Sequence, residues 1–397
     1  MPLLPRPSLA PDLPARSASP IRAAVIGAGM IAEVHRRSIR TAGGQVAGVL
    51  ASSAQRSAEA GAAWSAPGEP VRGYQDADQL LADPDIDVVH ICTPNHTHVA
   101  YAEQALDAGK HVVCEKPLAV SVEEAERLSA AADRAGTIAA VPFVYRYHPL
   151  IRELRARRVA GEFGTWHLLH GSYLQDWMLD PDASGWRVDP RDGGASRAFA
   201  DIGSHWCDLV EFVSGERFTE LTARGSVVVP DRPVTGAKSF TAPDTGSAAG
   251  RAPVVTEDAA AVLFRSENGV LAATVISQVS AGRKNRLWFE LDGSAGSAVF
   301  DQESPETVWL GGRSESRLLH RGAGDTSPEQ QRLTVVPPGH PQGYVDCFAA
   351  FTADVYTAIT TGAVPEGLPL FADGLRSAHL VDAFLTASDT GTWTKVN

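Results

Sequence analysis

The stretch Ala23-Ala24-Val25-Ile26-Gly27-Ala28-Gly29-Met30-Ile31-Ala32 decides the fold of this chain. It predicts a buried strand, a glycine turn and the start of a helix. Gly27 permits the tight turn, and Gly29 lets the backbone approach a pyrophosphate. Met30 and Ile31 open the helix, whose free N–H groups attract an anion. A glycine turn in any α/β fold would look similar, but the strand–turn–helix context favours dinucleotide binding.

Up to residue 145 the chain alternates short apolar runs with helical patterns. This alternation predicts a parallel, doubly wound sheet covered by helices, the α/β class. After residue 145 strands dominate, which predicts an α+β domain with a large, mostly antiparallel open sheet. The predicted strands span residues 23–26, 45–51, 88–92, 111–114, 138–142, 166–175, 221–229, 258–264, 270–279 and 286–292, and the main helices span 30–42, 54–63, 98–108, 122–135, 149–159, 201–213, 343–360 and 374–387.

These patterns divide the chain into three parts. Residues 1–20 are rich in proline and predict a flexible N-terminal tail. Residues 21–145 predict a Rossmann dinucleotide-binding domain. Residues 146–397 predict an α/β substrate-binding domain, whose C-terminal helix we expect to pack back on the first domain. Within it, residues 230–256 and 311–330 are rich in Gly, Pro and Ser and predict long surface loops.

Composition excludes several classes of partner. The chain has 397 residues and a formal net charge of −12, so a basic nucleic-acid-binding face is not expected. The acidic balance also disfavours anionic membranes, and no apolar run approaches the roughly 20 residues of a membrane span. The cysteines are far apart and predict reduced thiols in a cytoplasmic protein without a metal site: Cys92, Cys114, Cys207 and Cys347.

The end of the second predicted strand bears on the choice between NAD and NADP. An acidic residue is expected there to hold the ribose diol, but the chain has Ala51. Ser52, Ser53 and Arg56 follow, and two hydroxyls with a guanidinium could receive a 2′-phosphate. Alternatively, Arg56 is a solvated helix residue and backbone contacts hold NAD. The balance slightly favours NADP, with dual use also compatible.

Two further loops follow strands of the same predicted sheet. Thr93, Pro94 and Asn95 follow the strand at 88–92, with His98 expected nearby on the nicotinamide side. Glu115 and Lys116 follow the strand at 111–114. Ligands of doubly wound sheets bind outside the carboxyl ends of the strands, so both loops should line one crevice.

A lysine and an Asp/His pair supply the predicted chemistry. Lys116 can stabilise an alkoxide that develops as hydride leaves, although most lysines are simply surface cations. Asp201 and His205 are four residues apart and share one face of a helix, which suits proton transfer by His205 with help from the carboxylate. Such a pair alone is also compatible with a surface salt bridge, or with metal ligands that lack a third partner.

The order of these motifs resembles the glucose–fructose oxidoreductase/inositol dehydrogenase/rhizopine catabolism (Gfo/Idh/MocA) family. The resemblance covers residues 21–393 and implies that Lys116, Asp201 and His205 act as the family's Lys/Asp/His set. It also implies a second domain whose large sheet forms a homo-oligomer, a dimer or tetramer. The residue at Ala51 resembles the NADP-using branch typified by 1,5-anhydrofructose reductase. The motifs are GAGMIA, Thr93-Pro94-Asn95, Cys114-Glu115-Lys116-Pro117, Trp186-Arg187, Gly193-Gly194 and Asp201-Ile202-Gly203-Ser204-His205.

Amides, carboxylates and aromatic rings in the second domain predict a carbohydrate or polyol substrate. The run at 173–177 resembles levoglucosan-dehydrogenase-like members and suggests a sugar, anhydrosugar, glycoside or cyclitol. Alternatively, these residues simply alternate between the core face and the solvent face of a strand, which would account for about half of them. The expected substrate contacts, besides the Lys/Asp/His set, are Tyr145, Arg146, Tyr173, Gln175, Asp176, Trp177 and Arg187.

Three functions remain open at this stage. The leading hypothesis is an NAD(P)-dependent dehydrogenase or reductase that acts on a secondary alcohol. The alternatives are a glycosidase that uses transient oxidation by a bound NAD, and a sugar or redox sensor without catalysis. Retention of all three polar residues of the set argues against the sensor, which needs no proton relay.

Overall fold

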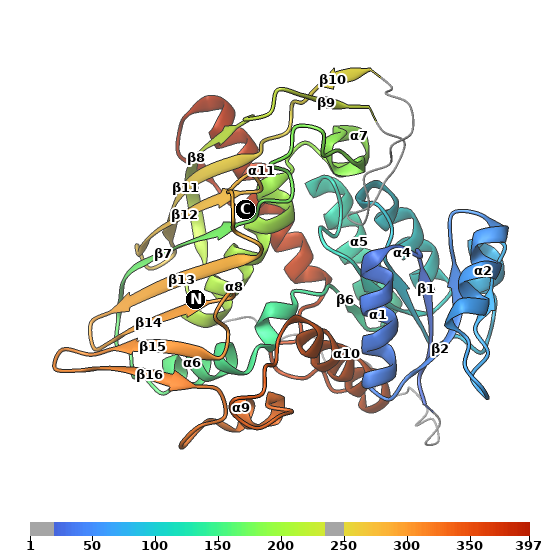
Figure 1. Cartoon of the computed structure of the whole chain (residues 1–397), viewed down its shortest axis with the longest axis horizontal. Coiled ribbons are helices and arrows are strands. Elements are labelled where there is room, and N and C mark those ends of the chain that lie inside the picture. The colour runs from blue at the N-terminus through green and yellow to red at the C-terminus, as the bar shows by residue number, and fades with distance from the viewer. Residues whose placement is uncertain (1–19, 235–249) are drawn as a thin grey trace.

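The computed structural model describes residues 20–234 and 250–397 (Figure 1). The predicted flexible tail, apart from residue 20, lies outside the described residues, and so does the middle of the predicted loop at 230–256.

The N-terminal part is built on a six-stranded parallel sheet with the strand order β3-β2-β1-β4-β5-β6. Its strands are β1 (Arg22–Ile26), β2 (Gln45–Leu50), β3 (Arg72–Gly73), β4 (Val88–Ile91), β5 (His111–Cys114) and β6 (Ala139–Ala140). Its helices are α1 (Met30–Thr41), α2 (Ala54–Trp64), α3 (Ala77–Leu81), α4 (His98–Asp107) and α5 (Val122–Ala135). The strand order reverses between β1 and β4, which creates the crevice in which doubly wound sheets bind ligands. The predicted Rossmann fold is confirmed.

The C-terminal part contains a nine-stranded sheet with the order β16-β15-β14-β13-β7-β12-β11-β8-β17. All neighbours pair antiparallel except β7 and β12, so the predicted mostly antiparallel sheet is confirmed. The strands are β7 (Trp166–Leu174), β8 (Phe218–Ser226), β11 (Ala259–Ser266), β12 (Leu271–Ser277), β13 (Arg286–Gly293), β14 (Ser297–Asp301), β15 (Thr307–Gly311), β16 (Ser316–His320) and β17 (Thr394–Lys395).

Helices cover one face of this large sheet and leave the other open. Helices α6 (Pro149–Val159), α8 (Ser204–Ser214) and α11 (Phe371–Thr390) lie on the side that faces the first sheet (Figure 1). Side chains along β11 therefore alternate in burial: Val262 and Phe264 are buried, while Leu263 is 44% exposed.

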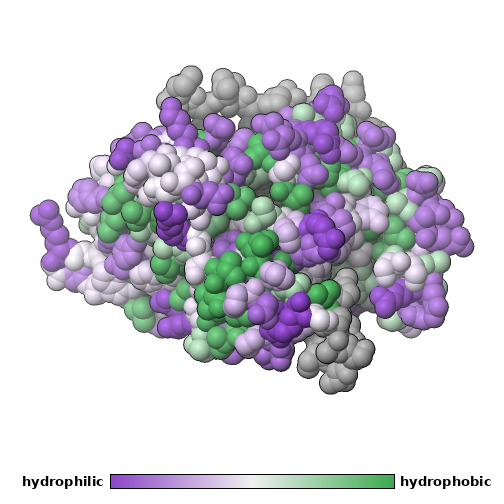
Figure 2. Space-filling model, turned by 90° about the horizontal axis from the view of Figure 1, so that it is seen from above, coloured by the Kyte–Doolittle hydropathy of each residue, from purple (hydrophilic) through white to green (hydrophobic). Residues whose placement is uncertain are grey.

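Seen from above, the molecular surface mixes hydrophilic and hydrophobic residues (Figure 2).

The last helices return to the first sheet. Helix α10 (Tyr344–Thr361) lies beside α1 (Figure 1), and its Phe351 and Val355 share a buried cluster with Val25 and Val49 of the first sheet. Helix α11 packs against α5 as well as against β8. Helix α11 therefore contacts both domains, while α10 packs on the first sheet.

Both predicted surface loops contain strands. Residues 230–256 include β9 (Asp231–Pro233) and β10 (Arg251–Pro253), which pair antiparallel, and an ion pair between Arg251 and Asp231 joins them. Residues 311–330 include β16 and the start of α9 (Pro328–Leu333). Glycine and serine suggested loops there, but strand pairing overrode the weak local preference, with β9 and β10 forming a separate two-stranded sheet and β16 adding to the edge of the large one.

Candidate active site

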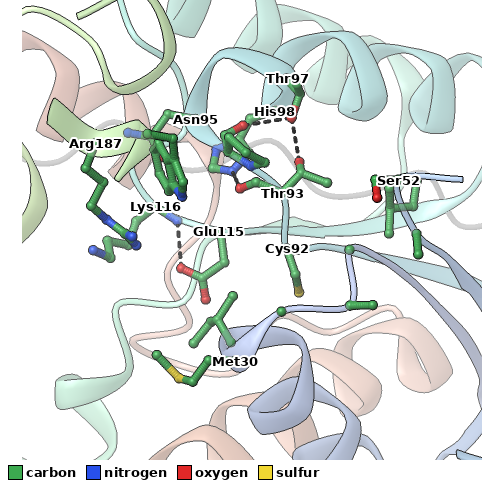
Figure 3. Close-up of a pocket in the computed structure, with 18 of the residues that line it drawn as sticks. Met30, Ser52, Cys92, Thr93, Asn95, Thr97, His98, Glu115, Lys116 and Arg187 are labelled. Carbon is green, nitrogen blue, oxygen red and sulfur yellow. Dashed lines mark hydrogen bonds between the residues drawn. The ribbon is translucent and has the colours of Figure 1, made fainter. Parts of the chain in front are cut away.

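A cavity of about 1090 Å³ lies at the carboxyl ends of the first sheet's strands and extends to the second domain. This volume lies slightly above the ~300–1,000 Å³ usual for small-molecule sites, which suits a dinucleotide beside a substrate. Most residues predicted from the sequence line it (Figure 3). They are Gly27, Gly29, Met30, Ile31, Ser52, Arg56, Thr93, Pro94, Asn95, His98, Glu115, Lys116, Tyr145, Tyr173, Gln175, Arg187, Asp201 and His205.

The glycine loop has the shape that a pyrophosphate requires. Gly27 has a φ of 111°, and a Cβ there would lie 2.6 Å from the carbonyl oxygen of Cys92. A Cβ at Gly29, in contrast, would meet no described heavy atom within 4 Å, so open space lies above this backbone. Helix α1 begins at the next residue without a side-chain cap, which leaves its first N–H groups available to an anion. The residues present therefore fit a dinucleotide.

The end of β2 carries no carboxylate but does carry a hydroxyl and a guanidinium. The Nη1 atom of Arg56 lies 3.3 Å from the Oγ atom of Ser52, and both residues line the cavity. Ser53 does not line it, because its hydroxyl accepts a hydrogen bond from the backbone N–H of Arg56 and caps α2. The prediction that Ser53 contacts the cofactor is therefore not supported by its position.

The loop after β4 is tied to both domains. The Asn95 side chain donates to the carbonyl of Gly193 in the second domain, at 2.9 Å. The ring nitrogens of His98 lie 2.8 Å and 2.9 Å from the carbonyl oxygens of Pro117 and Thr93. His98 thus bridges the loops after β4 and β5, and burial lowers its pKa below the usual value.

Lys116 is held by Asp201 across the domain junction. Its Nζ atom donates to Oδ1 of Asp201 at 2.6 Å and to the backbone carbonyl of the same residue at 3.0 Å. The side chain of Gln278 donates to the other carboxylate oxygen at 2.8 Å. Burial alone would raise the pKa of Asp201, but the charges of Lys116 and Arg187 outweigh it and hold the pKa well below its usual range. The carboxylate therefore stays ionised and orients the ammonium.

The ring of His205 can accept a proton. It is buried, its ring packs edge-on against Phe143 and Tyr145, and no hydrogen bond to its nitrogens is found among the described residues. Burial and the nearby charge of Lys116 lower its pKa well below the usual value, so the ring is neutral near pH 7. The expectation that Asp201 assists His205 directly is not met in the described chain, because both carboxylate oxygens bind Lys116 or Gln278 instead.

A polar network of tyrosine and amide side chains also lines the cavity. The hydroxyls of Tyr145 and Tyr173 lie 2.8 Å apart, and Asn285 donates to the first at 2.9 Å and accepts from the second at 2.7 Å. Gln175 also donates to Asn285, at 2.9 Å. These groups present several donors and acceptors on a rigid aromatic frame, which suits a ligand with many hydroxyls.

Comparison with known proteins places this chain in a family. Residues 21–143 match the model of the oxidoreductase family with an NAD-binding Rossmann fold, and residues 151–299 match the GFO/IDH/MocA C-terminal domain. The levoglucosan dehydrogenase of Pseudarthrobacter phenanthrenivorans is 30% identical over 362 residues, which cover 84% of this chain and 91% of that enzyme. The chain belongs to the Gfo/Idh/MocA oxidoreductase family.

Solved structures of other family members superpose on most of this chain. A levoglucosan dehydrogenase in complex with NADH and levoglucosan superposes with a TM-score of 0.85 and 27% identity, covering 95% of this chain and 100% of that one. An inositol dehydrogenase homolog from Azotobacter vinelandii, in complex with NADH and myo-inositol, gives 0.81 and 27%, covering 95% and 98%. The similarity thus spans both domains of this Gfo/Idh/MocA chain.

Three residues predicted to contact substrate do not line the cavity. Arg146 is buried, and its guanidinium forms ion pairs with Asp208 and Asp373. These ion pairs link it to helices α8 and α11. Asp176 pairs with Lys284 at 2.7 Å. The indole of Trp177 donates to Gln175 at 3.0 Å and thus supports a lining residue rather than lining the cavity itself.

Sequence reasoning missed several lining or supporting residues. Asn285, Tyr344 and Trp186 line the cavity, and Gln278 holds Asp201. Trp186 stands in one of the motifs given above, beside Arg187. The positions of Gln278 and Asn285 depend on how β12 and β13 pair with β7, and no local pattern encodes that register.

Among the described residues, no group with metal-ligand geometry lies in this cavity. In the described chain one group has metal-ligand geometry, His170 with Glu290 and Asp292, and it lies on β7 and β13 away from the cavity. No helix within residues 20–234 and 250–397 is both long and apolar enough to cross a bilayer.

Proposed function

We propose that this family member oxidises a secondary alcohol of a sugar, anhydrosugar, glycoside or cyclitol, or reduces the corresponding ketone. One arrangement carries the proposal. Lys116 and the neutral, unbonded ring of His205 line the same cavity as the glycine loop. A cation for the reacting oxygen and an acceptor for its proton thus stand beside a dinucleotide site.

Each side chain then has one task in the oxidation. When bound, the nicotinamide accepts the hydride that leaves the carbinol carbon. His205 takes the hydroxyl proton at a ring nitrogen, and the oxygen keeps the electron pair that forms the C=O bond. Lys116 stabilises the negative charge that develops on this oxygen, while Asp201 keeps the ammonium in place. Reduction runs through the same groups in reverse, with His205 as the proton donor.

The polar network that lines the cavity supports the substrate class. Tyr145, Tyr173, Gln175 and Asn285 offer paired hydroxyls and amides, and the Trp186 ring lines the same cavity. Hydroxyls of a ring can bond to such groups, while its C–H faces pack on aromatic rings. The names of the levoglucosan and inositol dehydrogenases that resemble this chain support the same class.

We further propose that the site uses both NAD and NADP, with a slight preference for NADP. Ala51 offers no carboxylate to repel a 2′-phosphate, and Ser52 with Arg56 could bind one. The NADH-bound relatives support use of NAD. The four free, buried cysteines support a cytoplasmic location.

A homo-oligomer, a dimer or tetramer, is the proposed assembly. The open face of the large sheet exposes Leu263, Leu271 and Val275, which are 44–49% accessible. Apolar residues grouped on an open sheet face favour burial against a second copy.

The test is turnover with a panel of sugars, anhydrosugars, glycosides and inositols in the presence of NAD⁺ or NADP⁺, read as nicotinamide absorbance. Steady reduction of the cofactor with one substrate class supports the dehydrogenase. Cleavage of a glycoside without net reduction would instead indicate the glycosidase, and ligand binding without turnover would indicate the sensor.

A further inference from the structure

A chain of buried hydrogen-bonding groups runs from the interior of the first domain to the cavity wall. The Nε2 atom of His35 lies 2.9 Å from Oε1 of Glu115, and its Nδ1 atom lies 2.9 Å from Nδ1 of His90. The Nε2 atom of His90 lies 3.4 Å from the hydroxyl of Tyr356. Both histidines are fully buried, and they come from α1 and β4, while Tyr356 comes from α10.

The protons of this chain can be assigned from donor and acceptor chemistry. Burial, and then the proximity of His35, lower the pKa of His90 well below its usual value, so this ring is neutral. A carboxylate only accepts, so His35 donates from Nε2 to Glu115. One proton must lie between the facing Nδ1 atoms. The Tyr356 hydroxyl can donate to Nε2 of His90, so a continuous run of donors and acceptors leads to Glu115.

The end of the chain is a charged group in the cofactor cavity. Glu115 is 7% exposed, and it lines the cavity immediately before Lys116. Burial would raise its pKa, but the hydrogen bond and charge of His35 outweigh burial and lower it. In Figure 3 the carboxylate lies between Lys116 and Met30, and its Oε2 atom accepts a hydrogen bond from the backbone N–H of Lys116 at 3.1 Å. Both carboxylate oxygens are thus fixed.

We propose that Tyr356, His90 and His35 are positioning residues that hold the Glu115 carboxylate ionised in the cavity wall, and that this charge makes the site prefer oxidised over reduced nicotinamide. The inference rests on the proposed function, since it needs a nicotinamide in the cavity. The oxidised ring is positively charged and the reduced ring is neutral. A fixed anion in a poorly solvated wall therefore stabilises only the first by its charge.

The test measures binding rather than turnover. The dissociation constants of NAD⁺ and NADH, or of NADP⁺ and NADPH if these bind more tightly, are determined by calorimetry and nicotinamide fluorescence for the full chain. Glu115→Gln should weaken binding of the oxidised form about tenfold and change that of the reduced form less than threefold. His90→Leu should shift the binding preference in the same direction but less, because it removes the partner of His35 and leaves the Glu115 carboxylate in place.

Two further variants keep the result interpretable. Tyr356→Phe removes one hydroxyl from a packed ring, so it should fold, and it should lower the preference for the oxidised form by about twofold. His148→Asn changes another fully buried histidine that is not part of the chain, so the preference should stay as in the wild type. Nitrogen NMR of the imidazoles should show a proton on Nε2 of His35, the atom that faces the Glu115 carboxylate.

The binding results test this inference separately from the proposed function on which it rests. Equal weakening of both redox forms in Glu115→Gln, or an unchanged ratio in Glu115→Gln and Tyr356→Phe alike, would overturn the role of the charge while leaving the nicotinamide site intact. Failure of the wild type to bind any of the four nucleotides would overturn the nicotinamide site, and this inference with it.

Discussion

The Nζ atom of Lys116 lies 2.6 Å from Oδ1 of Asp201, although 85 residues separate the two along the chain. The lysine follows the fifth strand of the first sheet, and the aspartate belongs to the helical turn at Phe199–Gly203 in the second domain. The contact therefore joins the two domains at the reacting end of the cavity. Solvent screens this ion pair little, because each side chain is only 14% exposed.

Replacing Lys116 with methionine should remove stabilisation of the developing oxyanion. We expect kcat/KM to fall by about 10²–10³-fold, with the cofactor dissociation constant changed less than threefold. The matched control is Lys284→Met, because Lys284 forms a similar pair with Asp176 outside the cavity. Loss of cofactor affinity without loss of kcat would contradict the assigned role.

Asp201→Asn should reduce turnover through Lys116 rather than through His205. The carboxylate bonds to the lysine and Gln278, so kcat should fall while the pH profile keeps a His205 limb, moved to lower pH because the Asp201 charge no longer raises the pKa of His205. A pH profile measured for this variant beside the wild type distinguishes the two roles. A profile that loses its His205 limb would restore the direct Asp–His partnership.

The pH dependence of oxidation should reflect the lowered pKa of His205. The base must be neutral, so the oxidation rate falls only as pH drops through a pKa below 6.5, and reduction shows the opposite trend. We expect kcat/KM for oxidation to stay near its plateau at pH 6. His205→Gln should lower kcat by about 10²–10⁴-fold and flatten the profile. Half-loss of wild-type activity above pH 7 would contradict this assignment.

The cofactor preference should respond to the end of β2. Arg56→Ala should weaken NADP⁺ binding about tenfold and leave NAD⁺ binding within threefold, because a charge-assisted contact to phosphate contributes about 1.5–3 kcal/mol. Ala51→Asp should favour NAD⁺, since a carboxylate bonds the ribose diol and repels a phosphate. Dissociation constants for both cofactors check the pair of variants. An Arg56→Ala enzyme with an unchanged preference would sink this explanation.

The open sheet face should carry the oligomer. Val275→Arg places a charge in the centre of that face, so the assembly should dissociate in analytical ultracentrifugation. Val159→Arg is the control, because Val159 is also exposed but ends helix α6 on another surface. A monomeric wild type would contradict the proposed assembly, and an oligomer that tolerates Val275→Arg would place the interface elsewhere.

The parts of the site that sequence predicted are those fixed by chain order. Gly27, Thr93 and Lys116 each follow a parallel strand, and such strand ends meet at one edge of the sheet whatever the rest of the chain does. The pairing of Arg146 could not be read in this way. Its partners Asp208 and Asp373 lie 62 and 227 residues away, and only the packing of α8 and α11 brings them together.

The contacts of Asp201 also could not be predicted from the sequence. Spacing suggested a shared helical face with His205, but the chain forms a π-helical turn at Phe199–Gly203, and the carboxylate turns to Lys116 and Gln278. The contact to Gln278 arises where β12 ends beside this turn. Sequence spacing within one helix could not foresee a competing partner from a strand.

The most direct measurement of the central claim is the nicotinamide absorbance of the wild type, Lys116→Met and His205→Gln with the substrate panel and each cofactor. We predict steady reduction by the wild type with a sugar, anhydrosugar, glycoside or cyclitol, and at least a hundredfold slower reduction by both variants while cofactor binding persists. Tight binding of cofactor without any net reduction by the wild type would contradict the account.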